Sequence, residues 1–184
     1  MKNRMELAVY FRDQGYTMGV EVGVFNGFYS EVLMETIPNL RLWGVDPYMV
    51  YEGYRDHKFV KSMQDAEAFA HGLLEGYPQY EFLKMTSQEA AMKFDPNSLD
   101  FVFIDGNHAF EYVKEDLELW TPKVKSGGIV SGHDYYVTPH GNVGVIRAVN
   151  DFVASNNYML QTTDWDMTME SEDDRQPCWY FIQK

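Results

Sequence analysis

The sequence has a single cysteine and no long apolar run. Because Cys178 has no second cysteine to pair with, an intramolecular disulfide and a cysteine-based metal cluster are both excluded. No stretch approaches the roughly 20 consecutive apolar residues that a membrane-spanning helix needs. Residues 1–16 are interrupted by charges and lack the apolar core of a signal peptide. We therefore expect a cytoplasmic protein that makes no membrane contact.

Basic residues are also scarce. The chain carries 15 Lys and Arg against 28 Asp and Glu, which gives a formal net charge of -13. A surface this acidic repels phosphate backbones, so DNA and RNA are not expected as partners. The short basic cluster of Arg55, His57, Lys58 and Lys61 is interleaved with acids and aromatic side chains. Small neutral or cationic molecules are therefore the expected ligands, and both a monomer and a homo-oligomer remain open.

Short apolar runs alternate with amphipathic ones along the chain, which is typical of βαβ units around a largely parallel sheet. The expected strands cover residues 18–22, 40–45, 80–85, 99–104, 128–131, 158–162 and 179–182. The expected helices cover residues 3–14, 62–76, 86–93, 110–120 and 143–154. A further helix is expected between the first two strands, with Phe28, Val32 and Leu33 on one face, and it ends before Pro38. Asn142 is the expected N-cap of the last helix. This pattern predicts a single α/β domain over residues 1–184, with a mainly parallel seven-stranded sheet, helices on both faces and a final antiparallel hairpin.

An acid and two glycines occupy the turn after the first expected strand, in the spacing Glu21-x-Gly23-x-x-x-Gly27. Glycines there let the backbone turn sharply and let a ligand approach the main chain. The G-x-G-x-x-G spacing that seats a pyrophosphate is absent, and an acid before the loop suits a ligand with an amino-acid moiety. Asp46, which ends the second strand, can accept hydrogen bonds from both hydroxyls of a ribose. In the alternative, Glu21 only caps local backbone and Asp46 makes a turn before Pro47.

A second polar group follows two neighbouring strands. Asp105 comes directly after the apolar run 101–104, where a buried carboxylate is costly unless it is paired or binds a metal. His133 and Asp134 follow the next strand, so the three side chains are expected in one crevice at the carboxyl ends of the strands. Carboxylates suit a hard divalent ion, and an imidazole shifts the preference towards Mn, Fe, Co or Zn.

His108 is a candidate general base, because the ordinary pKa of an imidazole lies near neutrality. Two structural alternatives stay open. Asn107 or His108 caps the helix that follows, or His108 hydrogen-bonds Asp105 or Asp134.

Several aromatic side chains surround the expected site and either form a ring-lined pocket or belong to the core. They are Tyr48, Tyr51, Tyr54, Phe59, Tyr135 and Tyr136. Residues 47–61 are interpreted as an irregular excursion or lid, and His140 as part of a mobile loop. The acids Glu170, Glu172, Asp173 and Asp174 are interpreted as a solvated loop.

Over roughly residues 17–155 the sequence resembles a known family. The runs VEVGVFNGFYS and LWGVDPY resemble the first two motifs of class I S-adenosylmethionine-dependent methyltransferases. Thr86-Ser87-Gln88 is similar to the segment that meets the adenine in the catechol-type branch. The stretch FIDGNHAFEYVKEDLELWTPKVKSGGIVSGHDYY resembles small methyltransferases related to the sugar O-methyltransferases of macrolide pathways.

The resemblance implies a Rossmann-like fold that binds S-adenosylmethionine, and O-methylation of a small hydroxylated metabolite or sugar. The implied cofactor-binding residues are Glu21, Gly23, Asn26, Gly27, Asp46, Ser87, Gln88 and Asp105. In the resembling enzymes a magnesium-type ion binds two substrate hydroxyls, and its positions correspond to Asp105, His133 and Asp134. His133 departs from the usual carboxylate, which leaves the need for a metal, Mg or Mn, open. Asp105, His108 and Asp134 are the candidate catalytic residues.

Three other functions are alternatives to the methyltransferase. A metal-dependent hydrolase or hydroxylase-like enzyme could use the same acids and histidines, but the acid-glycine loop and Asp46 would then have no task. A non-catalytic nucleoside-binding domain would bind the cofactor without turnover. An NAD-dependent reductase is disfavoured because the pyrophosphate fingerprint is missing.

Overall fold

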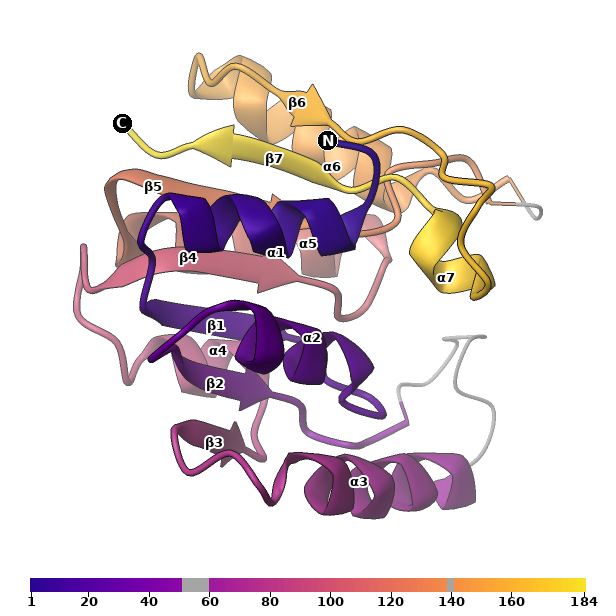
Figure 1. Ribbon diagram of the computed structural model, residues 1–184. Coiled ribbons are helices and arrows are strands. Elements are labelled where there is room, and N and C mark those ends of the chain that lie inside the picture. Colours follow the sequence, from indigo (N-terminus) through magenta and orange to yellow (C-terminus); the bar gives the residue numbers. More distant parts are fainter. Residues whose placement is uncertain (51–59, 139–140) are drawn as a thin grey trace.

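The computed structural model describes residues 1–50, 60–138 and 141–184, and its described strands form one seven-stranded sheet in the order β3-β2-β1-β4-β5-β7-β6 (Figure 1). Strands β1 to β5 are parallel, and β7 is antiparallel to both β5 and β6. Their bounds are β1 Met18–Val22, β2 Arg41–Val45, β3 Tyr80–Leu83, β4 Leu99–Ile104, β5 Val124–Gly132, β6 Gln161–Thr162 and β7 Trp179–Ile182. The expected mainly parallel sheet with an antiparallel end is confirmed.

Helices cover both faces of the sheet, as predicted (Figure 1). Helices α1 (Arg4–Asp13) and α2 (Phe28–Thr36) lie on one face, and their buried side chains join Phe101 and Phe103 of β4 in one apolar cluster. Helices α4 (Ser87–Ala91), α5 (Phe110–Trp120) and α6 (Gly144–Ser155) cover the other face and join Val102 and Ile104. Because successive side chains of a strand point to opposite faces, the apolar β4 feeds both clusters.

The remaining helices lie at the edges of the sheet. Helix α3 (Val60–Leu74) packs against Val24 and Tyr48. A 3-10 turn, Thr121–Lys123, leads into β5, and helix α7 (Glu172–Arg175) lies between β6 and β7 along the chain. No helix among the described residues is both long enough and apolar enough to cross a membrane.

Several predicted details were wrong. Phe28 is 49% exposed, whereas Leu33 is buried and Val32 is partly buried on the predicted face of α2, and Tyr29 joins them in the core. Strand β5 begins at residue 124, because Val124 pairs with Leu99 of β4 before a register shift, and the exposed residues 125–127 follow it. Strand β6 has only 2 residues, and α7 was not predicted in the acidic stretch. The N-cap of α6 is Val143, with Asn142 accepting a hydrogen bond from Gly144 N at 2.8 Å.

Candidate active site

A cavity of about 750 Å³ opens at the carboxyl ends of β1, β2 and β4. Strand order reverses between β1 and β4, and open α/β sheets bind ligands at such a point. Of the predicted cofactor residues, Gly23, Asp46, Ser87, Gln88 and Asp105 line this cavity. The structure therefore brings together residues that are far apart in the sequence, at the edge where the pattern predicted them.

Both glycines of the loop are required by its geometry. Gly23 has a φ of +92°, and a Cβ added to it would lie 2.1 Å from the carbonyl oxygen of Asp105. Gly27 has a φ of +82° and begins α2, where an added Cβ would lie 3.0 Å from Leu74 Cδ1. A side chain at either position would force the backbone to move. The loop can thus press closely against the end of β4.

Asp46 braces this loop from the end of β2. Its Oδ2 accepts hydrogen bonds from the backbone N–H groups of Val24 at 3.1 Å and Phe25 at 2.9 Å. Its Oδ1 accepts one from Tyr48 N at 2.7 Å, which makes the turn expected before Pro47. Only 8% of Asp46 is exposed, yet it lines the cavity. Each carboxylate oxygen can accept more than one hydrogen bond, so bracing the loop does not prevent Asp46 from also binding a ligand.

Glu21 lies behind the cavity wall instead of lining it. The side chain is 2% exposed and accepts a hydrogen bond from Ser30 on α2, whose Oγ is 2.9 Å from Tyr80 Oη. Burial raises the pKa of Glu21 to about 8, although the Ser30 hydrogen bond acts in the opposite direction. The described structure gives Glu21 no direct route to a ligand in the cavity. Its expected role in cofactor binding stays a prediction.

Asp105, His108, His133 and Asp134 converge beside the cavity. His108 Nε2 lies 3.0 Å from Asp134 Oδ2 and 3.4 Å from Asp105 Oδ1. His133 Nδ1 lies 3.4 Å and 3.9 Å from the same two oxygens. Burial alone would raise the pKa of Asp134, but the hydrogen bond from His133 and the charges of both imidazoles lower it overall. Asp134 has a φ of +57°, so the backbone is held in the left-handed region to aim this carboxylate.

Three of these side chains could hold a metal ion. The ligand atoms of Asp105, His108 and Asp134 all lie within 4.8 Å of one another. Ligands at about 2.1 Å from one ion lie roughly 3.0 to 3.4 Å apart, which matches the two distances from His108 Nε2. The sequence pointed to His133 as the nitrogen ligand, and the structure adds His108. His133 is 4% exposed, and its Nε2 is buried with no hydrogen-bond partner among the described residues.

Arg4 is a site residue that the sequence did not reveal. From α1, its guanidinium lies 3.8 Å from Asp105 Oδ2, and its Nε donates to Asp174 Oδ1 of α7 at 2.6 Å. It also stacks over the ring of Tyr29, with Cζ 5.3 Å from the centroid. Asp174, predicted to lie in a solvated loop, is thus half of a mostly buried ion pair. No local pattern marks Arg4, because its partners come from distant parts of the chain.

The floor of the cavity is built where α4 meets α5. Thr86 caps α4 through a reciprocal capping box with Glu89. Ser87 Oγ accepts a hydrogen bond from Trp120 Nε1 at 2.8 Å and donates one to Asp116 Oδ1. Gln88 donates to Glu115. Sequence reasoning found Ser87 and Gln88 but missed Asp116, which is 6% exposed and lines the cavity.

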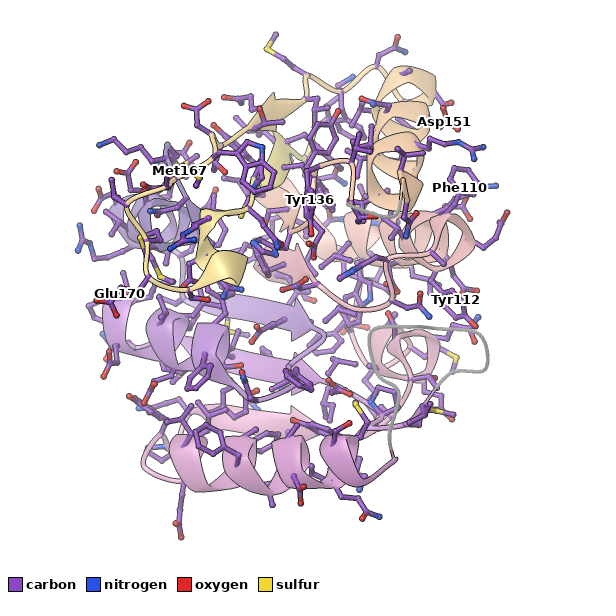
Figure 2. All side chains as sticks on the ribbon, turned by 90° about the vertical axis from the view of Figure 1, so that its right-hand side faces the viewer. Phe110, Tyr112, Tyr136, Asp151, Met167 and Glu170 are labelled. Carbon is purple, nitrogen blue, oxygen red and sulfur yellow. The ribbon has the colours of Figure 1, made fainter. Side chains whose placement is uncertain are left out.

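The predicted aromatic pocket is only partly described. Tyr48 is buried in the small core cluster under α3, and Tyr136 packs edge-on against Trp165. Figure 2 looks onto the carboxyl-end side of the sheet and shows Tyr136 between Tyr112 of α5 and Met167. The apolar and aromatic side chains of the cavity wall include Phe25, Met49, Met63 and Tyr112. Tyr51, Tyr54, Phe59, the basic residues 55–58 and His140 lie outside the described residues.

The other expected residues have structural partners. Asn26 Oδ1 accepts a hydrogen bond from Phe28 N at 3.3 Å, which shapes the glycine loop and does not line the cavity. Asn107 Oδ1 accepts one from Ala109 N at 3.0 Å just before α5, whose N-cap residue is Ala109. The alternative in which His108 itself caps the helix is therefore disfavoured, and the one in which it contacts Asp105 and Asp134 agrees with the geometry.

Known proteins resemble this chain in sequence. Residues 20–135 match the model of a family described as a methyltransferase domain. An uncharacterized protein of Acanthamoeba polyphaga mimivirus is 27% identical over 139 residues, which cover 73% of this chain and 58% of that protein. The chain spans 9% and 58% of the lengths of two curated relatives that it matches.

Solved structures share the fold. An O-methyltransferase from Bacillus cereus in complex with S-adenosylhomocysteine has a TM-score of 0.67 at 14% identity, over 97% of this chain and 79% of that one. A protein assigned as an rRNA methylase from Clostridium thermocellum has a TM-score of 0.69 at 15% identity, over 100% and 96% of the two chains. The Rossmann-like methyltransferase fold expected from the sequence is confirmed.

Proposed function

Because this chain belongs to the family of methyltransferase domains, we propose that it methylates a hydroxyl group of a small metabolite or sugar, with S-adenosylmethionine as the methyl donor. The observation that carries the proposal is the position of the cavity. It extends from the glycine loop and Asp46 to Asp105, where the Asp–His cluster begins. One end thus suits a nucleoside, and the other offers groups that can take a proton from a hydroxyl.

The charge of the cavity supports a cationic methyl donor. Most of the charged side chains in its described lining are acids. The basic one is Lys114, and the acids are Asp46, Asp105, Glu111, Glu115, Asp116 and Glu118. S-adenosylmethionine carries a sulfonium cation, which a carboxylate-lined site attracts. The same charges repel phosphates, so they argue against an RNA acceptor although one structural neighbour is assigned as an rRNA methylase.

Methyl transfer from a sulfonium needs an acceptor oxygen held in line and freed of its proton. His108 is the candidate for accepting that proton, because Asp134 and Asp105, at 3.0 Å and 3.4 Å from its Nε2, stabilise the imidazolium that results. The guanidinium of Arg4 lies on the other side of Asp105 and holds its carboxylate in place. The partly buried setting of these groups reduces their contact with water and strengthens their mutual interactions.

The Asp–His cluster also fits a divalent ion such as Mg or Mn. Asp105 and Asp134 would hold it, with His108 or His133 as the nitrogen ligand. Such an ion would lower the pKa of an acceptor hydroxyl and orient it. If His108 binds the ion it cannot also act as the base, whereas His133 as the ligand leaves His108 available. The choice between the two histidines therefore decides the role of His108.

Calorimetric titration with S-adenosylhomocysteine, with and without MnCl₂, tests the proposal. Clear binding by the wild type would support the donor site, and an effect of Mn on that binding would support the metal cluster. Asp95→Ala is the matched control, because Asp95 is exposed and outside the cavity lining. Absence of binding in both conditions would refute the proposal and favour a metal-dependent hydrolase.

A further inference from the structure

Asp116 presents one carboxylate oxygen to the cavity. The residue lies on α5, is 6% exposed and lines the cavity. Its Oδ1 accepts the hydrogen bond of Ser87. Its Oδ2 points towards Gly106, since a Cβ built on that glycine would lie 3.9 Å from it. Within residues 1–50, 60–138 and 141–184 no group hydrogen-bonds this oxygen.

The neighbours of Asp116 fix which of its oxygens faces the cavity. Trp120 Nε1 can only donate, and it donates to Ser87 Oγ at 2.8 Å. The single hydroxyl proton of Ser87 is therefore directed to Asp116 Oδ1. Ser87 itself is held at the first turn of α4, which the Thr86–Glu89 capping box secures. An acceptor at the Oδ1 position satisfies the Ser87 proton, and the atom at the Oδ2 position is left for a ligand.

We propose that Asp116 selects the base of the bound nucleoside, with Oδ2 accepting a hydrogen bond from the 6-amino group of adenine and excluding 6-oxo purines. This inference rests on the proposed function, which places the ribose at Asp46. Asp46, Thr86, Ser87, Gln88 and Asp116 line one cavity, so a base attached to a ribose at Asp46 would share the cavity with Asp116. A 6-oxo purine would set its carbonyl oxygen against Oδ2, acceptor against acceptor, in a buried place where such a mismatch is costly.

The protonation of Asp116 modulates this selection. Burial raises the pKa of Asp116 to about 7, against the effect of the Ser87 hydrogen bond, and Glu115 on the same helix adds to the rise. Above that pH the carboxylate only accepts, so the 6-amino purine is preferred. Below it the carboxylic acid can donate its proton to a 6-oxo group. The preference for adenine should therefore weaken as the pH falls.

The substitution Asp116→Asn tests the inference by reversing one hydrogen bond. Since the hydroxyl proton of Ser87 finds its acceptor at the Oδ1 position, we expect the amide oxygen there and the NH₂ group towards the cavity. A donor in that place favours the 6-oxo purine. Calorimetry at pH 8 compares S-adenosylhomocysteine with S-inosylhomocysteine, its deaminated analogue, on the wild type, Asp116→Asn and the exposed control Asp95→Asn.

The expected result is a preference of about ten- to a hundredfold for the adenosine ligand in the wild type and in Asp95→Asn. The preference should vanish or invert in Asp116→Asn. In the wild type the preference for the adenosine ligand should shrink between pH 8 and pH 6. This measurement needs no variant, so it tests the inference even if Asp116→Asn does not fold. An unchanged preference in the variant, or no pH effect, would overturn the role of Asp116 while leaving the proposed function intact. A wild type that binds neither ligand would refute the proposed function itself.

Discussion

Glu21→Gln should make the protein less sensitive to alkaline pH. An acid with a pKa raised by folding binds its proton more tightly in the folded state than in the unfolded state. The stability it contributes is thus full below its unfolded pKa and is lost as the pH rises through the folded pKa. For Glu21 these limits are the ordinary value of 4.5 and the folded value of about 8. The wild type should therefore lose stability between pH 5 and pH 8.

The size of the effect follows from burial. The gap between the two pKa values corresponds to at most about 5 kcal/mol at 1.36 kcal/mol per pKa unit. Gln cannot ionise and can still accept the hydrogen bond of Ser30 through its amide oxygen. The variant should therefore lack this part of the loss of stability. Its free energy of unfolding should still fall somewhat as the pH rises, because burial also raises the pKa of Asp116, to about 7.

Urea denaturation at pH 5, 6, 7 and 8 measures the free energy of unfolding of both proteins. The difference between Glu21→Gln and the wild type should grow with pH in favour of the variant. Glu75→Gln is the matched control, since Glu75 is exposed at the end of α3 and should leave the pH dependence unchanged. If the wild type and Glu21→Gln change in parallel over this range, Glu21 is ionised in the folded protein and the reasoning fails.

Three further predictions concern the site. Asp46→Ala should weaken S-adenosylhomocysteine binding at least tenfold because it removes both the proposed ligand contact and the brace of the loop, whereas Asp134→Ala should spare binding and lower turnover. Equal losses of binding and turnover in both variants would show that the two subsites are misassigned. Calorimetry with MnCl₂ should show that the protein binds Mn, that Asp134→Ala abolishes this binding and that His108→Ala weakens it at least tenfold. A loss of Mn binding in His133→Ala but not in His108→Ala would make His133 the nitrogen ligand. Gly23→Ala should destabilise the fold by about 3 kcal/mol or more in urea denaturation, because its Cβ would meet Asp105 O. Gly72→Ala in α3, with open space around its added Cβ, should be neutral or stabilising by about 1 kcal/mol, and equal effects of the two changes would contradict this account.

The strands that position the site could be predicted from sequence because buried parallel strands are continuous apolar runs. Strands β1, β4 and β7 begin and end where the pattern placed them. The exposed start of β5 could not be recognised, since residues 125–127 are polar or glycine and lie in the irregularity between the two paired positions Val124 and Ile129. Helix α7 is too short and too acidic to show a helical apolar period.

The position of Glu21 could have been inferred but was not. Val20 and Val22 point to the face covered by α4, α5 and α6, so strand alternation places Glu21 on the opposite face, under α2. Its partner in the register is Phe103, which also points to that face. Glu21 thus lies behind the cavity wall. The wall itself includes Gly23, which follows β1, and Asp105, which follows β4.

Arg4 shows which part of the site no motif could have revealed. The family match covers residues 20–135, which contain Asp46, Asp105, His108 and Asp134. Arg4 and its partner Asp174 lie outside this range, yet the guanidinium reaches Asp105. Breaking a buried ion pair from one side costs about 3 to 5 kcal/mol, because the other charge is left uncompensated. Arg4, which Asp174 holds from the other end of the chain, therefore supports Asp105 in a cluster whose other residues come from the matched range.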